Sequence, residues 1–111
     1  MNQGQGLPGV PAAGVPEQAY LVDVREDEEW VAGHAPGAQH IPLGTLGERA
    51  EQIPRDRDVY VICRSGGRSA RATQALNTAG FKAINVSDGM TGWESSGLEM
   101  ISESGGPPFV A

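Results

Sequence analysis

Short apolar runs recur along this chain and predict the strands of a sheet. The runs at residues 20–24, 59–63 and 83–86 are near-continuous, as in strands that are buried on both faces of a parallel sheet. A shorter strand is expected at residues 40–41, where the following proline ends it because proline has no N–H for the ladder. A short edge strand near Val10 is compatible with the neighbouring prolines, which sheet edges tolerate.

Helix-like patterns fill the segments between these runs. The clearest is the Ala-rich segment from Ala70 to Ala79, which Gly80 is placed to end. Residues 43–53 have apolar residues at helical spacing, although two glycines weaken the pattern. A turn at residues 87–93 leads into a short final helix.

An acidic segment after the first strand predicts one more short helix. It opens near residue 25, with Asp27 as its cap and with Trp30 and Val31 turned inward.

Strands that alternate with helices in this way predict an α/β fold with a mostly parallel sheet and right-handed crossovers. The length of 111 residues fits one domain. We expect a Pro/Gly-rich lead-in over residues 1–18, the folded domain over residues 19–100 and a polar tail over residues 101–111. Ligands of such sheets bind beyond the carboxyl ends of the strands, and Cys63 stands at one of these ends.

The composition narrows the classes of function. A formal net charge of −6, with no run of Lys or Arg, argues against a nucleic-acid surface. No apolar run approaches the roughly 20 residues that span a bilayer, and no signal-peptide pattern opens the chain, so we expect a cytoplasmic protein without a membrane partner. The single cysteine cannot form an internal disulfide, and no Cys/His cluster has zinc spacing. We therefore expect neither a metal nor a cofactor.

The one cysteine stands at the junction of a predicted strand and a predicted helix. A loop that enters a helix N-terminus gathers N–H donors and the positive end of the helix dipole around whatever it encloses. This setting lowers the pKa of a thiol, and the two neighbouring arginines add positive charge, so Cys63 is the candidate catalytic nucleophile. The candidate substrate-binding residues are the rest of the loop: Arg64, Ser65, Gly66, Gly67, Arg68 and Ser69.

A thiolate in this loop could carry sulfur. It would attack the outer sulfur of an anionic sulfane donor, while loop N–H groups and the two arginines stabilise the leaving sulfite or thiolate. Cys63 would then hold a persulfide until a nucleophilic acceptor removes the terminal sulfur. Gly66 and Gly67 would let the backbone turn tightly around that sulfur. A lone cysteine after an apolar strand is most often a buried, inert core residue. The Gly-Gly loop and the two arginines favour a reactive cysteine over an inert one here.

The length of the loop distinguishes a sulfur-carrying protein from a cysteine phosphatase or an arsenate reductase. Cysteine phosphatases with a similar strand, loop and helix need Cys, five residues and then Arg, which gives a cradle wide enough for phosphate. Here the sixth residue after Cys63 is Ser69, and Arg68 comes one position early. The smaller ring suits a single sulfur atom better than a phosphoryl group.

Four motifs follow one another over residues 21–93. They are Leu-Val-Asp-Val-Arg-Glu at 21–26, Gly-His-Ala-Pro-Gly-Ala at 33–38 with His-Ile-Pro at 40–42, Val-Tyr-Val-Ile-Cys-Arg-Ser-Gly-Gly-Arg-Ser at 59–69, and Asp-Gly-Met-Thr-Gly-Trp at 88–93. In this order they resemble the single-domain rhodaneses, a family of sulfurtransferases. The resemblance implies a five-stranded parallel sheet with helices on both sides and a catalytic cysteine that carries a persulfide. The chain departs from the family pattern before Tyr20, where the usual first helix is shortened.

The expected partners follow from this chemistry. We expect a small anionic sulfur donor, thiosulfate or a persulfide, and a thiol or cyanide as acceptor, with a protein sulfur partner equally compatible. The chain is expected to be a monomer or a weak dimer. A non-catalytic rhodanese-like module that binds a partner stays open as the alternative.

Polar residues outside the loop have structural roles in this interpretation. Asp23 and Arg25 are expected to hold the base of the loop by hydrogen bonds. His34 and His40 each lie in a Gly/Pro turn and are interpreted as hydrogen-bonding groups of a turn or of the core, rather than as general bases.

Overall fold

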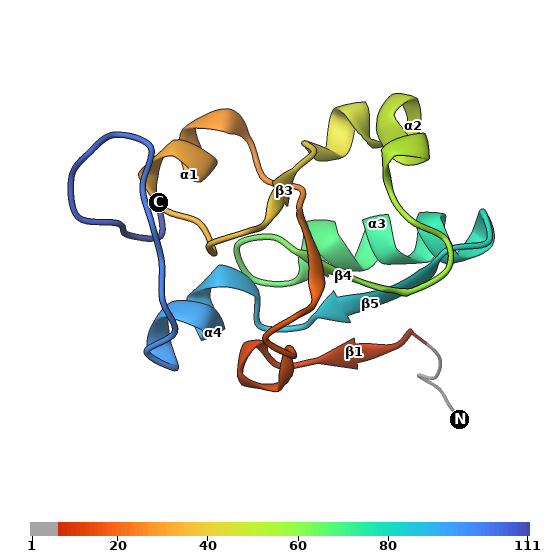
Figure 1. The fold of residues 1–111 in the computed structure, drawn as a ribbon, viewed down its shortest axis with the longest axis horizontal. Coiled ribbons are helices and arrows are strands. Elements are labelled where there is room, and N and C mark those ends of the chain that lie inside the picture. Colours follow the sequence, from red (N-terminus) through yellow and green to blue (C-terminus); the bar gives the residue numbers. More distant parts are fainter. Residues whose placement is uncertain (1–6) are drawn as a thin grey trace.

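The computed structural model of the chain describes residues 7–111, which form a five-stranded, all-parallel sheet with helices on both faces (Figure 1). The order of the strands is β1-β5-β4-β2-β3. The strands are β1 (Gly9–Val10), β2 (Tyr20–Asp23), β3 (Gln39–His40), β4 (Asp58–Ile62) and β5 (Lys82–Val86). The helices are α1 (Asp27–Ala32), α2 (Leu46–Arg49), α3 (Gly67–Thr78) and α4 (Gly89–Ser95). The α/β class and the five strands predicted from the sequence are confirmed.

The register of the central strands brings their carboxyl ends to one edge of the sheet. Asp23 at the end of β2 pairs with Ile62 at the end of β4, and Val61 pairs with Asn85 of β5. Cys63 directly follows Ile62, so the thiol lies at the edge where ligands of parallel sheets bind.

Alternating residues of β4 divide the core between the two faces of the sheet. Val59, Val61 and Cys63 belong to one buried cluster, to which α2 and α3 contribute Leu46, Ala72 and Leu76. Ile62 belongs to the cluster on the other face, together with Val86, Met90 of α4 and Ala12. Because all of these side chains are at least nine-tenths buried, the strand that ends at the cysteine is fixed on both faces.

Helix α3 has the glycine cap that the sequence predicts. Gly80 adopts a φ of 97°, the left-handed region that favours glycine. The N–H of Phe81 donates to the carbonyl of Leu76 at 3.0 Å, and the N–H of Gly80 donates to the carbonyl of Asn77 at 3.1 Å. These two bonds form a Schellman-type end, in which the buried Phe81 packs back on the core.

Four details of the predicted helices were wrong. The cap of α1 is Glu26, which forms a capping box with Glu29, and not Asp27; Val31 is exposed. Residues 43–53 form only the short α2 between two 3₁₀ turns, as expected for a segment that contains two glycines. The final helix, α4, begins at Gly89, inside the predicted turn.

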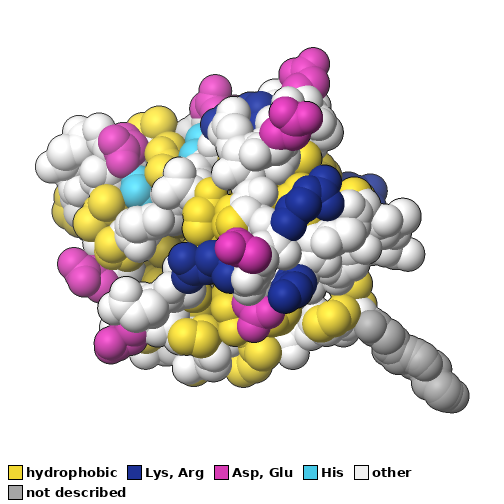
Figure 2. Space-filling model, turned by 45° about the vertical axis from the view of Figure 1, so that its right-hand side comes forward, with side chains coloured by type: hydrophobic (Ala, Val, Ile, Leu, Met, Phe, Trp, Pro, Cys, Tyr) yellow, Lys and Arg dark blue, Asp and Glu magenta, His cyan; other side chains and the backbone are white. Residues whose placement is uncertain are grey.

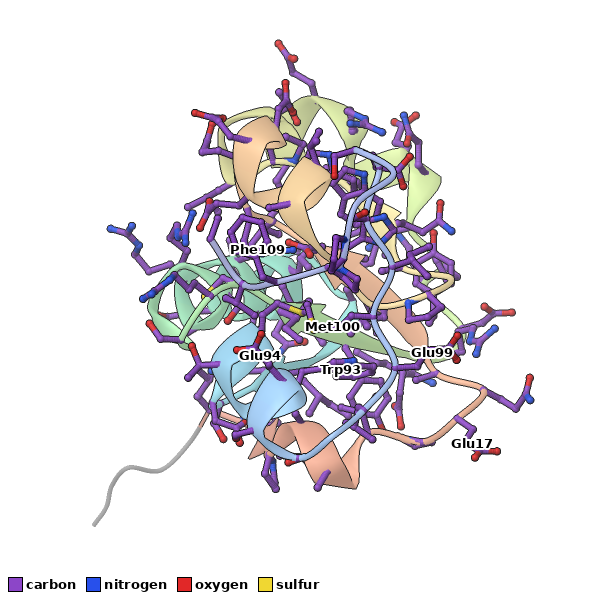
Figure 3. All side chains as sticks on the ribbon, turned by 90° about the vertical axis from the view of Figure 1, so that its left-hand side faces the viewer. Glu17, Trp93, Glu94, Glu99, Met100 and Phe109 are labelled. Atoms are coloured by element: carbon purple, nitrogen blue, oxygen red, sulfur yellow. The ribbon has the colours of Figure 1, made fainter. Side chains whose placement is uncertain are left out.

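Both terminal segments pack on the domain. Residues 1–6 of the predicted lead-in lie outside the described residues, but β1 pairs with β5 at the sheet edge, and the N–H of Ala12 donates to the Asp88 carboxylate at 2.7 Å. The predicted tail runs back across the end of α1 (Figure 1): the N–H of Phe109 donates to the Ala32 carbonyl, and that of Glu103 donates to the Val31 carbonyl. Figure 3 shows Met100 and Phe109 on this returning segment.

Within residues 7–111, the structure contains no helix that is both long enough and apolar enough to cross a membrane.

A buried ion pair holds the sheet edge beside the cysteine. Asp23 and Arg25 are both fully buried, and Nη2 of Arg25 donates to the Asp23 carboxylate at 2.8 Å. Nη2 also donates to the carbonyl of Gly33 at 2.7 Å, which ties the end of α1 to the end of β2. Both residues are structural, as expected, but their hydrogen bonds join the end of β2 to the end of α1 instead of holding the base of the cysteine loop.

Replacing one partner of this pair should be costly, because it leaves the other as an uncompensated buried charge. We expect Asp23→Asn to lower the free energy of unfolding by about 3–5 kcal/mol, as measured by urea denaturation. The control is Asp56→Asn at an exposed position, for which a change within about 0.5 kcal/mol is expected. Similar losses in the two variants would contradict this account of the pair.

Candidate active site

The candidate active site is built around the buried thiol of Cys63. Its side chain is 1% exposed and lies where β4 ends and the loop into α3 begins. The backbone N–H of Gly66 donates to Sγ at 3.1 Å, and the hydroxyl of Ser69 donates to it at 3.2 Å. Both donors come from residues that follow the cysteine closely, so the chain curls around the sulfur atom.

These hydrogen bonds decide the ionisation of the thiol. Burial is the largest single influence on the pKa of Cys63 and acts to raise it. The Ser69 hydroxyl and the backbone N–H groups of Ser69, Gly66 and Ser65 act together in the opposite direction and outweigh burial, so the net pKa of Cys63 is lowered. A lowered thiol pKa favours the thiolate, which is the reactive form.

Gly66 makes this curl possible. It adopts a φ of 106° at the N-cap of α3, and a Cβ there would overlap the carbonyl of Ser87. A side chain is therefore excluded both by the left-handed backbone and by the close approach of the β5 end. Gly67 differs from the sequence-based expectation, because its φ is not positive and a Cβ there would meet open space. Only the first of the two glycines is required by the turn.

Helix α4 binds the outer side of the loop. The N–H of Met90 donates to the carbonyl of Cys63 at 2.8 Å, and that of Thr91 donates to the carbonyl of Arg64 at 3.0 Å. Gly89 permits this approach, since a Cβ there would lie 2.6 Å from the Cys63 carbonyl oxygen. With its carbonyls held outward, the loop is free to turn its N–H groups toward Sγ. The sequence contained this helix as a motif, but nothing in the sequence indicated what it bonds to.

The two loop arginines are both bonded to other parts of the chain. Arg68 forms a two-bond ion pair with Glu29 of α1, with N–O distances of 2.8 and 2.9 Å. The hydrogen bond from Arg68 holds the pKa of Glu29 at about 2, and the same bond raises the pKa of Arg68. Arg64 is exposed, and its Nε donates to the carbonyl of Ala111 at 2.9 Å. The expected positive charges are therefore present at the loop, but Arg68 is neutralised by a residue 39 positions away.

Ser65 is exposed and acts on the thiol through its backbone N–H, whereas Ser69 also acts through its hydroxyl. Ser69 itself is fully buried. Of the two loop serines, only Ser69 acts on the thiol through its side chain.

The two histidines belong to an aromatic stack beside α1. Trp30 lies parallel to His34 with 3.5 Å between the ring centres, and parallel to His40 with 4.7 Å between them. One nitrogen of the His34 ring lies 2.7 Å from the Glu103 carboxylate, and one nitrogen of the His40 ring lies 2.8 Å from the carbonyl of Arg25. These contacts give both rings hydrogen-bonding roles in packing, as predicted.

The surface of the molecule carries charges of both signs on the face that Figure 2 draws. Figure 2 shows Lys and Arg side chains interspersed with Asp and Glu side chains on one face of the molecule. Among residues 7–111 no group of three or more His, Cys, Asp or Glu side chains is arranged to hold a metal ion.

Comparison with known proteins assigns the chain to a family. The model of the Rhodanese-like domain matches residues 12–96. The chain belongs to the rhodanese-like family. This confirms the resemblance carried by the four sequence motifs.

Several family members cover most of the chain. YtwF of Bacillus subtilis is 46% identical over 78 residues, which are 70% of this chain and 76% of that protein. A sulfurtransferase of Allochromatium vinosum is 36% identical over 80% of this chain and 84% of its own length. The crystal structure of a rhodanese-related protein from Thermoplasma volcanium superposes with a TM-score of 0.80, at 30% identity, over 85% of this chain and 97% of that one.

The Ser69 hydroxyl should contribute measurably to the reactivity of the thiol. We expect Ser69→Ala to raise the pKa of Cys63, and hence to slow alkylation by iodoacetamide about threefold to tenfold near pH 7 while leaving the limiting rate at high pH unchanged. The measurement is the alkylation rate against pH. Ser65→Ala removes a hydroxyl from the same loop without touching Sγ, and should keep the wild-type profile. Equal profiles for wild type and Ser69→Ala would contradict this role for Ser69.

Proposed function

We propose that the protein is a sulfurtransferase that carries sulfane sulfur as a persulfide on Cys63. The observation that supports this most directly is the ring of donors on Sγ, which favours the thiolate in a buried position. A persulfide on Cys63 would place its terminal, anionic sulfur within the same loop, whose other candidate substrate-binding residues are Arg64, Ser65, Gly67 and Arg68.

The first step is a displacement on the donor. The Cys63 thiolate attacks the outer sulfur of thiosulfate; the new S–S bond forms as the sulfur–sulfur bond of the donor breaks, and sulfite leaves with the electron pair. With a thiol persulfide as donor, the same attack on the terminal sulfur releases the thiolate of the donor. Loop N–H groups stabilise the negative charge in either case.

The second step returns the enzyme to its starting state. A thiolate or cyanide attacks the terminal sulfur of the Cys63 persulfide and leaves with it as a new persulfide or as thiocyanate. The Cys63 thiolate departs as the leaving group, which its lowered pKa favours. A protein thiol can serve as the acceptor in the same way. A single reactive thiol functions in a reducing compartment, so we place this activity in the cytoplasm.

The family relationship supports the same reaction class, since one member that covers most of the chain is named a sulfurtransferase. The geometry gives less support to phosphoryl transfer. At the sixth position after the cysteine the loop places the Ser69 hydroxyl on Sγ, and its last arginine is paired with Glu29. A binding module without catalysis would have no need for a thiol with a lowered pKa.

The proposal predicts that Cys63 gains one sulfur atom. After incubation with thiosulfate or inorganic polysulfide, intact-mass spectrometry should show an added sulfur that cyanide removes as thiocyanate. Cys63→Ser differs by a single atom and should gain nothing. The proposal fails if no donor labels the wild-type protein, or if Cys63→Ser gains the same cyanide-sensitive mass. Turnover of an aryl phosphate or of arsenate that depends on Cys63 would favour the alternative reaction class.

A further inference from the structure

The ion pair between Arg68 and Glu29 joins the first turn of α3, the helix that follows the cysteine loop, to the first turn of α1. Nη1 and Nη2 of the Arg68 guanidinium both donate to the Glu29 carboxylate. The Arg68 side chain is 29% exposed and the Glu29 side chain is 16% exposed. Such a two-bond pair fixes the direction of the guanidinium as well as its charge.

Arg68 directly precedes Ser69, whose hydroxyl donates to Sγ of Cys63, so the chain holds Arg68 next to a residue that contacts the thiol. The charge of Cys63 acts to raise the pKa of Arg68, as does that of Glu26, although both act less strongly than Glu29. Three further carboxylates stand beside Glu29, namely the cap Glu26 and the exposed Asp27 and Glu28. An anion that approaches Cys63 from this side therefore meets an arginine whose charge Glu29 already neutralises.

We propose that Glu29 sets the charge selectivity of the Cys63 site by holding Arg68, so that the site discriminates against dianions such as thiosulfate and favours persulfides of thiols that bring little net charge. The selectivity among sulfur donors rests on the proposed function. The effect of Glu29 on the access of anions to Cys63 can be tested even if the protein transfers no sulfur. Glu29 is a positioning residue in this account, since it acts through Arg68 and touches neither sulfur nor donor.

The pair persists across the working pH range. Because the pKa of Glu29 is held at about 2, the carboxylate stays ionised at every pH at which the Cys63 thiolate is populated. Other titratable groups around the pair are Glu26, which is also bonded to Glu29 through the capping box, and Cys63 itself. The selectivity should therefore be a fixed property and should not switch with pH.

Glu29→Gln isolates the charge of the residue. A glutamine keeps an oxygen that can accept the N–H of Glu26, which Glu29 accepts at 2.9 Å, so the helix cap is preserved while the charge is lost. Glu28→Gln is the matched control, because it removes the same charge from the neighbouring exposed position. The double variant with Glu29→Gln and Arg68→Gln restores the net charge of the wild-type pair.

The first readout uses two alkylating agents of similar shape, neutral iodoacetamide and anionic iodoacetate. We expect Glu29→Gln to raise the ratio of the iodoacetate rate to the iodoacetamide rate about threefold at low ionic strength, because Arg68 is left unpaired. Glu28→Gln and the double variant should stay near the wild-type ratio. This readout depends only on the thiol and on the charge around it.

The second readout uses sulfur donors. Thiosulfate carries twice the charge of iodoacetate, so the persulfidation rate of Glu29→Gln by thiosulfate should rise about tenfold. The rate with cysteine persulfide, which reacts as Cys63–S⁻ + R–S–SH → Cys63–S–SH + R–S⁻, should change less than about twofold.

The outcomes separate the two proposals. An unchanged iodoacetate ratio in Glu29→Gln, an equal rise in Glu28→Gln, or a rise that survives removal of Arg68 would each overturn the role of Glu29. If the ratio rises as expected but no donor persulfidates any variant, the sulfurtransferase proposal fails and control of anion access by Glu29 stands.

Discussion

The structure depends on one constraint, which is that hydrogen-bond donors must converge on a single buried sulfur atom. A thiol at this depth would ordinarily be protonated and inert, because burial disfavours its charged form. The N–H of Gly66 and the hydroxyl of Ser69 reverse that tendency, and they can reach Sγ only because the loop closes tightly after the cysteine. The positive φ of Gly66 and its contact with the end of β5 allow no side chain at the point of closure. The lowered pKa of Cys63 is thus a consequence of the closed loop, which brings backbone N–H groups and the Ser69 hydroxyl to Sγ.

The rest of the fold supports this loop from outside. Backbone N–H groups of α4 donate to the outward carbonyls of Cys63 and Arg64, and β4 is packed on both faces up to its last residue. The buried pair of Asp23 and Arg25 joins the neighbouring strand end to the end of α1. Helix α1 then supplies Glu29, the partner of Arg68. Each element near the site therefore contributes either to the shape of the loop or to the charge around it.

Much of the fold and of the candidate site could be predicted from the sequence. The features that could not be predicted share one physical cause. Apolar runs predict β2, β4 and β5 because strands buried on both faces leave a strong local pattern, and Gly80 predicts the end of α3 for a local steric reason. The thiol, its loop and the family resemblance were likewise readable from neighbouring residues. Two contacts join segments that are far apart in the chain: the ion pair of Arg68 with Glu29 and the bond from Met90 to the Cys63 carbonyl. No local sequence pattern predicts such contacts. The returning C-terminal segment was missed for the same reason, since its backbone bonds to α1 do not depend on side-chain type.

The central claim is that the hydrogen-bond donors of the loop stabilise the Cys63 thiolate. A pH titration of the wild-type protein by amide NMR tests it most directly, because the donors themselves report the charge on the sulfur. We expect the amide resonances of Ser65, Gly66 and Ser69 to shift together, with one midpoint below the value of about 8.5 that is usual for a cysteine thiol. A common midpoint at or above 8.5, or amides that do not respond when Cys63 ionises, would contradict it.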